Sequence, residues 1–449
     1  MNANNAASNA NANIGSRLVF DKIMTSLRSP RSKQALPLGK TYTFRNNGLV
    51  VFRRKLDSRK HKENKLKRFG NLYEKICDLD NLKKAHAAAK KGKGFYREVK
   101  MVDEKPEFYL GKIRQMLLNH SYKVSKYSTK CINDKGKVRV LHKLPYYPDR
   151  IIHHAIMQVI EFVFEKTFCY HTCASLSGRG IKRASILTKR YASLSGGKGA
   201  FCLKIDIEKF YENINHEILK DFLARKFKDK ELLGLFDEII TNYPEKKGLP
   251  IGSYLSQFLA NFYLNNFDHW LKENKRQKYV VRFMDDVCIF GASKAKLHEL
   301  LRQIKAYIYF NLKLNLKQNY QIFPTNIRGV DFVGFRFFKH FVLLRKSNAL
   351  RCKRILRAVL IRQEKKELIS NRLFCGVNSY AGFFKACNGW RFVKRHFLPL
   401  LPSLASFYLA RICTKNSHFE RQKSVLNYAK KTFKGHFINN ASFKYQKTA

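Results

Sequence analysis

An α+β fold with more than one packed unit is predicted by three features of the sequence. The chain has 449 residues, which is too long for one ordinary domain. Long stretches carry apolar residues at three- and four-residue steps, as amphipathic helices do. Between them lie short apolar runs bounded by turn residues or acids, as in buried strands. With 45% hydrophobic and 13% aromatic residues, the chain can bury a sizeable core.

The N-terminal part precedes the helical region and has a character of its own. Residues 1–14 are Asn/Ala-rich low-complexity sequence, a composition that favours disorder. Residues 40–55, KTYTFRNNGLVVFRRK, predict a β-hairpin with Asn46-Asn47-Gly48 at the turn.

Helices are expected from Asn71, interrupted by one extended stretch. Apolar spacing predicts helices over residues 71–92 and 105–119 and from Asp149 onward. An extended stretch lies between the last two, with a turn at residues 134–136.

Strands and helices alternate from residue 200 onward. The expected elements are a strand at 200–207, helices across 214–243, a loop at 244–250, a helix at about 253–275, a hairpin of 279–283 with 287–291, a helix at 294–311 and a β-rich piece at 328–345. Residues 346–449 are expected to be helical, basic and aromatic.

The charge of the chain indicates a polyanionic partner. Lys and Arg number 88 against 33 Asp and Glu, for a formal charge of +55 and a pI near 10.1. The phosphate backbone of nucleic acid would neutralise this excess best, and a membrane surface is the rival. Basic clusters are spread from Arg45 to Lys447 rather than collected on one helix, which favours a long nucleic-acid channel.

Cysteine usage and hydropathy indicate a reduced compartment and no membrane span. Ten cysteines are scattered without an extracellular framework, and the N-terminal residues contain no apolar export signal. Cys169, His171 and Cys173 form a compact cluster, but no second Cys/His pair follows at zinc-finger spacing, so we expect no metal there. No uncharged apolar run reaches the ~18 residues of a membrane helix.

Two adjacent acids stand between apolar runs in RFMDDVCIF (282–290). Burying a charge is costly unless it is paired or binds a metal, so Asp285 and Asp286 either occupy a polar turn or hold a cation. A third acid, Asp206, ends the expected strand KIDI, where it could also be a helix N-cap. Acids from adjacent strand ends suit the two metal ions of phosphoryl and nucleotidyl transfer. Together with the +55 charge, the three acids favour that chemistry over a polar turn.

At these residues the sequence resembles the reverse transcriptases. FMDD is similar to their Tyr/Phe-x-Asp-Asp box, and the other boxes follow in the order of that family. The six boxes are 134–150, 204–216, 248–264, 282–286, 312–323 and 329–338. The resemblance runs from about Asn71 to about Phe397.

The resemblance implies a right-hand polymerase that copies an RNA template into cDNA. Its parts would be a disordered start and basic extension (1–67), fingers with the first palm entry (68–200), a palm with inserted finger helices (201–345), a helical thumb (346–400) and a basic C-terminal extension (401–449). It also implies that Asp206, Asp285 and Asp286 are the catalytic carboxylates. They would bind two Mg²⁺ ions, with Mn²⁺ as a substitute and the backbone carbonyl of Ile207 as a further ligand.

Four further residues take roles by the same resemblance. Tyr211 falls at the steric gate that excludes ribonucleotides, and Lys137 and Arg139 fall in the box that grips the incoming triphosphate. A Lys/Arg pair there would also neutralise the leaving pyrophosphate, although a solvated turn would carry the same residues. Lys317, or one of several neighbouring lysines, could protonate pyrophosphate.

One loop points to a subgroup. Ile251, Gly252 and Gln257 lie in a nucleotide-binding loop whose I-G-x-x-x-S-Q form resembles reverse transcriptases of diversity-generating retroelements. Residues 343–354 and 377–391 resemble that group too. An alkyl side chain at Ile251 lacks the hydrogen bonds of an amide, which fits the frequent misincorporation opposite template adenine in that group.

Two alternatives remain open. Bacterial antiphage reverse transcriptases, which use a dedicated non-coding RNA, also carry extra segments such as residues 1–67 and 414–449. A catalytically inactive RNA-binding scaffold is disfavoured because all three acids and the gate aromatic are present.

The expected partners follow from the same resemblance. They are a structured non-coding RNA template, a DNA primer or cDNA strand, dNTPs, and either a small accessory protein or a second copy of the chain. No membrane partner is expected, and the expected location is the cytoplasm of a bacterial cell or phage-infected host.

Overall fold

The structure is a computed structural model that describes residues 41–45, 48–52, 68–134, 136–365, 367, 369–384 and 386–400. The chain divides into two compact units, residues 1–65 and 66–449. In the first unit, β1 (Thr41–Arg45) and β2 (Gly48–Phe52) pair antiparallel, which confirms the hairpin predicted at 40–55. The predictions for residues 1–14 and 401–449 lie outside the described residues.

The second unit begins with helices and one hairpin. The elements are α2 (Tyr73–Cys77), α3 (Leu79–Ala89), α4 (Arg97–Glu104), α5 (Pro106–Leu118), β3 (Ser128–Asp134), β4 (Lys137–Lys143), η1 (Tyr146–Arg150) and α6 (Ile151–Thr167). The predicted helices are confirmed, and the predicted extended stretch forms the antiparallel strands β3 and β4. The sequence patterns did not predict α4, in which only Val99 and Val102 are buried, because two apolar residues give little periodic signal.

A four-stranded antiparallel sheet with strand order β6-β7-β5-β8 forms the centre of this unit. Its strands are β5 (Phe201–Asp206), β6 (Val280–Phe283), β7 (Asp286–Gly291) and β8 (Gln321–Pro324). The strand predicted at 200–207 and the predicted hairpin are confirmed. The four-residue strand β8 and helix α7 (Gly180–Ala192) were not predicted.

Further helices follow β5, and of these α13 and α14 pack against the sheet. In chain order, the helices are α8 (Phe210–Asn213), α9 (His216–Lys226), α10 (Lys230–Thr241), α11 (Tyr254–Tyr263), α12 (Asn265–His269), η2 (Trp270–Asn274), α13 (Lys294–Leu312) and α14 (Thr325–Arg328). The stretch predicted as one helix at 253–275 is therefore three consecutive helical pieces. No helix or strand lies at 244–250, where a loop was predicted.

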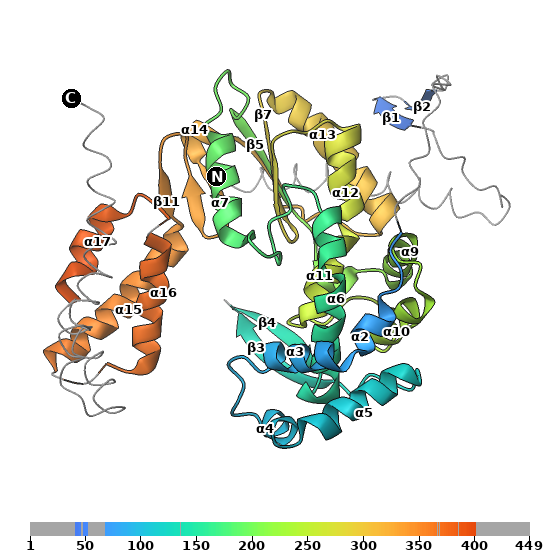
Figure 1. Ribbon diagram of the computed structural model, residues 1–449. Helices are drawn as coiled ribbons and strands as arrows, with labels where there is room; N and C mark the ends of the chain where they lie inside the picture. The colour runs from blue at the N-terminus through green and yellow to red at the C-terminus, as the bar shows by residue number, and fades with distance from the viewer. Residues whose placement is uncertain are drawn as a thin grey trace, which may run out of the picture. The chain divides into compact units, whose positions relative to one another are not determined.

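The two faces of the sheet are covered by different helices. Leu203 and Ile205 belong to the core that includes α13, whereas Cys202 belongs to the core that includes α7. Helix α7 packs against β6 and β7, and Figure 1 shows it beside the strands of this sheet. Because side chains alternate along a strand, Asp206 shares the α7 face with Cys202. Asp286, directly opposite Asp206, shares that face too.

The C-terminal part of the described chain is a small sheet followed by helices. β9 (Val330–Phe332), β10 (Phe335–Phe337) and β11 (Val342–Leu344) form an antiparallel sheet, confirming the β-rich piece predicted at 328–345. The helices are α15 (Lys346–Glu364), α16 (Asn371–Phe384), α17 (Trp390–His396) and η3 (Leu398–Leu400). They have their own buried core, in which α15 and α16 pack side by side.

Two further sequence predictions concern thiols and membranes. The nine cysteines in the described part of the chain are all free thiols, as predicted. Among the described helices, none combines the length and the hydropathy needed to cross a membrane.

Candidate active site

Three carboxylates meet at one end of the central sheet. Asp206 is the last residue of β5, and Asp286, the first residue of β7, is its partner in the strand register. Asp285 lies in the tight connection between β6 and β7. The structure therefore brings together the three acids singled out in the sequence, on two adjacent strands.

Two lysines partly neutralise these acids. Lys317 Nζ lies 2.6 Å from Asp206 Oδ2, and Lys204 Nζ lies 3.4 Å from Asp286 Oδ2. Burial, with repulsion from Asp206, still raises the pKa of Asp285 to about 6. Burial also raises the pKa of Asp286 to about 6, with Lys204 opposing and Asp206 adding to the shift. The cluster therefore holds more negative charge than its lysines compensate.

The free oxygens of this cluster fit a divalent cation. Asp206 Oδ1 and Asp286 Oδ1 are buried and have no hydrogen-bond partner, which is costly for a charged oxygen. Carboxylate oxygens are the ligands that Mg²⁺ prefers. Within the described ranges, however, no three His, Cys, Asp or Glu side chains form a ready-made ligand set. The acids thus offer part of a coordination shell, which water and substrate oxygens would complete.

The backbone of Ile207 is oriented toward the same place. Lys317 N donates to Asp206 O at 2.9 Å, and Glu208 N donates to Asn315 O at 2.8 Å. These bonds flank the antiparallel bridge between Ile207 and Leu316, so the peptide groups of Ile207 point to the opposite side, that of β7. Its carbonyl is therefore available on the side where Asp285 lies.

Tyr211 lies beside the Asp-Asp turn. Its hydroxyl donates to Met284 Sδ at 3.8 Å, and burial, then the charge of Asp285, raise its pKa above the usual value. The loop that ends in Pro250 holds its backbone, because Leu249 N donates to Tyr211 O at 2.8 Å. Gly248, at φ +95°, permits this approach, since a Cβ there would lie 2.8 Å from the Tyr211 carbonyl oxygen.

A cavity of about 820 Å³ brings the predicted nucleotide-binding loop together with the helices before it. Ile251, Gly252 and Gln257 line it. Its cations are Lys93, Arg97, Lys126, Lys143 and Arg150, and its aromatic rings include Tyr96, Tyr127, Tyr146 and Tyr254. Cations interleaved with aromatic rings suit a single nucleic-acid strand, whose phosphates and bases they can both contact.

The predicted triphosphate-gripping pair, Lys137 and Arg139, lies at the start of β4. Arg139 is exposed and is not among the residues that line this cavity. The residues of β4 that line the cavity are Leu141, His142 and Lys143, at the other end of the strand. The predicted role of Lys137 and Arg139 therefore remains a prediction.

Sequence reasoning missed two residues that support the acids, one by direct contact and one through the backbone of Met284. Lys204, which contacts Asp286, stands two positions before Asp206 and so on the same face of β5, a signal that the alternation rule could have used. Arg282, which donates to the Met284 carbonyl, gave no such signal because its buried partner Asp268 lies on a different element.

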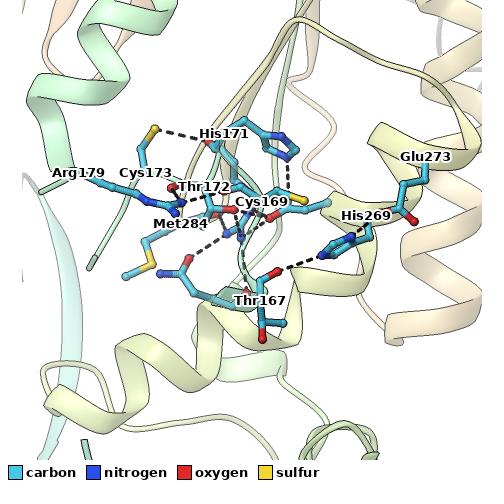
Figure 2. A network of polar contacts seen from close by, with 12 residues as sticks. Thr167, Cys169, His171, Thr172, Cys173, Arg179, His269, Glu273 and Met284 are labelled. Atoms are coloured by element: carbon cyan, nitrogen blue, oxygen red, sulfur yellow. Dashed lines mark hydrogen bonds and ion pairs between the residues drawn. The ribbon is translucent and has the colours of Figure 1, made fainter. Parts of the chain in front are cut away.

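Cys169, His171 and Cys173 belong to an internal polar network, shown in Figure 2. His171 Nε2 lies 3.3 Å from Asp268 Oδ1, and Cys173 Sγ donates to the His171 carbonyl at 3.5 Å. These side chains thus contact protein groups within the fold.

Comparison with known proteins finds a family match in the central part of the chain. Residues 121–337, just under half of the chain, match the family described as "Reverse transcriptase (RNA-dependent DNA polymerase)". This match includes the three acids, Tyr211 and Ile251, and the predicted right-hand polymerase class is confirmed with it.

Relatives are similar at low identity. Protein YkfC of Escherichia coli (strain K12) is 22% identical over 245 residues, which cover 45% of this chain and 64% of that protein. Nuclear intron maturase 4, mitochondrial, of Arabidopsis thaliana is 28% identical over 144 residues, which cover 30% of this chain and 18% of that protein. The chain thus spans less than two thirds of each.

Among solved structures, apo telomerase from Candida tropicalis is similar with a TM-score of 0.42 and 12% identity. The similarity covers 70% of this chain and 63% of that one.

Proposed function

We propose that the chain, with a reverse transcriptase domain at residues 121–337, is an RNA-directed DNA polymerase that makes cDNA by nucleotidyl transfer. The observation that carries this proposal is the meeting of Asp206, Asp285 and Asp286 at one sheet end, with two buried carboxylate oxygens unpartnered. Bound Mg²⁺ would supply charge stabilisation for the attacking and leaving oxygens. The three acids and the Ile207 carbonyl would hold it.

The residues around the acids would select and orient the nucleotide. Tyr211 contacts Met284 next to Asp285, where an aromatic ring would collide with a ribose 2′-hydroxyl. Lys317 Nζ lies at the acid cluster, so it is the lysine of its segment placed to give a proton to the leaving pyrophosphate. Lys204 Nζ, at Asp286, would add positive charge for the phosphates.

An RNA partner is favoured by three independent features. The formal charge of +55 requires a polyanion. The cavity beside Ile251 combines cations with aromatic rings. One relative is named an intron maturase.

We further propose that the enzyme is error-prone and belongs to a diversity-generating retroelement. The support is Ile251, which lines the cavity where an amide would offer hydrogen bonds to the nascent base pair. Use in antiphage defence, with a dedicated non-coding RNA, is the alternative, favoured by the basic residues at 414–449.

Primer extension tests the main proposal. The purified chain should add dNTPs to a DNA primer on an RNA template when Mg²⁺ is present. Asp206→Asn should abolish the addition, whereas Asp221→Asn, an exposed acid paired with Arg225 on α9, should not. RNA binding without any Mg²⁺-dependent extension by the unaltered chain would instead support an inactive scaffold.

A further inference from the structure

The buried side chain of Arg282 uses all of its nitrogen atoms to bind its surroundings. It is fully buried, as is Asp268. Arg282 Nε donates to both Asp268 oxygens at 2.8 and 2.9 Å, and Nη2 donates to Asp268 Oδ2 at 2.6 Å. Arg282 Nη1 donates to Asn261 Oδ1 at 2.9 Å and to the Met284 carbonyl at 3.0 Å. A planar guanidinium bound on this many sides has one orientation.

The segment around His171, which Figure 2 labels, also binds the backbone of Arg282. Arg282 N donates to His171 O, and Cys173 N donates to Arg282 O, both at 2.9 Å. Thr172 Oγ1 donates to Asp268 Oδ2 at 2.8 Å. Burial alone would raise the pKa of Asp268, but Arg282 and His171 hold it below its usual range, so the carboxylate stays charged. Strand β6, helices α11 and α12, and residues 171–173 are thereby joined at one guanidinium.

The Met284 carbonyl that Arg282 binds belongs to a residue in an unfavourable conformation. Met284 has φ +57°, the left-handed region that non-glycine residues avoid. It directly precedes Asp285, so its peptide orientation sets the direction in which the Asp285 side chain leaves the backbone. Its own side chain contacts the Tyr211 hydroxyl. Met284 thus links the buried network to the acids and to the proposed gate.

We propose that Arg282 is a positioning residue: its Nη1 holds the Met284 carbonyl, which keeps the left-handed turn and aims the Asp285 carboxylate. This inference rests on the proposed polymerase function, because its consequence is the rate of nucleotide addition. A buried ion pair is by itself weak support for a stabilising role, since replacing both ions by apolar groups is often neutral. The need to hold one backbone geometry at the turn before Asp285 would explain why a buried ion pair lies here.

The test distinguishes loss of the hydrogen bond to the Met284 carbonyl from a general loss of protein stability. Arg282→Lys keeps the charge but cannot form a planar fork, so the maximal rate of dNTP incorporation should fall at least about tenfold with unchanged affinity for the RNA template–primer. Glycine adopts positive φ without the steric cost that alanine has. Met284→Gly in the Arg282→Lys background should therefore restore the rate about five- to tenfold above Met284→Ala in that background.

Arg179→Lys is the matched control, since Arg179 Nη1 donates to the carbonyls of Cys169 and Thr172 at 2.8 Å and not to that of Met284. Its rate should stay close to that of the unaltered chain. If Arg282→Lys does not fold, Thr172→Val is used in the same assay. This change keeps the ion pair between Arg282 and Asp268 and removes the hydroxyl that donates to Asp268.

Two outcomes would overturn the inference. One is a normal rate for Arg282→Lys; the other is equal rates for the glycine and alanine variants at Met284. In both cases the unaltered chain would still add dNTPs. Failure of the proposed function itself would show as an inactive unaltered chain.

Discussion

Asp285→Asn should abolish polymerase activity and at the same time stabilise the folded protein at pH 8. The carboxyl is partly buried and lies near Asp206, and these two causes raise its pKa to about 6. The ionised carboxylate is therefore less stable in the folded state than in the unfolded chain, which lowers the free energy of unfolding. Asparagine keeps nearly the same shape and removes the charge.

The size of the effect follows from the pKa. The rise from 3.8 to about 6 is about two units, which corresponds to ~3 kcal/mol at pH values well above 6. Lys317 and partial contact with solvent reduce this, so we expect about 1–3 kcal/mol. Since 1 kcal/mol moves Tm by about 2–4 °C in chains of 150–250 residues and by less in longer ones, Tm should rise by roughly 2–5 °C.

The dependence on pH has a definite sign. The folded-state pKa lies above the unfolded one, so below about pH 4 the carboxyl is protonated in both states and the substitution changes little. The gain from Asp285→Asn should grow between about pH 4 and pH 6 and be complete above that range.

Thermal unfolding without divalent cations, at pH 4 and pH 8, measures this directly. Asp221→Asn is the control; it removes an exposed ion pair with Arg225 and should lower Tm slightly or not at all. A lower Tm for Asp285→Asn at pH 8, or a gain of equal size at both pH values, would refute the reasoning about the crowded acids.

The remaining predictions concern selection, binding and fidelity. Tyr211→Ala should admit ribonucleotides on the same primer–template, because the ring beside Met284 is removed; unchanged discrimination would place the gate elsewhere. The affinity for structured RNA should fall steeply between 50 and 200 mM salt as counterions are released, by about 10³-fold or more if six or more phosphates are contacted; a flat response would contradict a basic channel. Ile251→Gln should lower misincorporation opposite template adenine more than opposite other bases, read by sequencing cDNA from one template, since ~1.4 kcal/mol of discrimination is tenfold in errors. Accurate copying of adenine by the unaltered enzyme would favour the antiphage alternative.

Much of the fold could be predicted because its signals are local. The short apolar run at 200–207 predicted one strand, and the runs at 279–283 and 287–291 predicted a hairpin. The acids at these strand ends predicted where Asp206 and Asp286 meet. Helices with long periodic faces, such as α6 and α13, were found for the same reason.

The elements that were missed carry short or weak signals. β8 has four residues and is recognised only by its pairing with β5. The one long helix predicted at 253–275 breaks into α11, α12 and η2, since apolar spacing continues across the breaks.

The supporting residues of the site depend on tertiary contacts that no local pattern encodes. Asp268 and Arg282 are 14 positions apart and meet only when α12 packs beside β6. The left-handed Met284 gave no signal either, because methionine is not a residue that marks such a turn. The sequence also could not predict that Lys317 forms an ion pair with Asp206, since several neighbouring lysines looked equivalent.

The most direct measurement compares the unaltered chain with the double variant Asp285→Ala, Asp286→Ala in two assays on one RNA template–primer. Mg²⁺-dependent dNTP incorporation should be lost, because the carboxylates at the start of β7 are gone. RNA affinity should stay nearly the same, because it comes from cations such as those lining the cavity beside Ile251. Normal extension by the double variant would contradict the assignment of these acids as the catalytic centre.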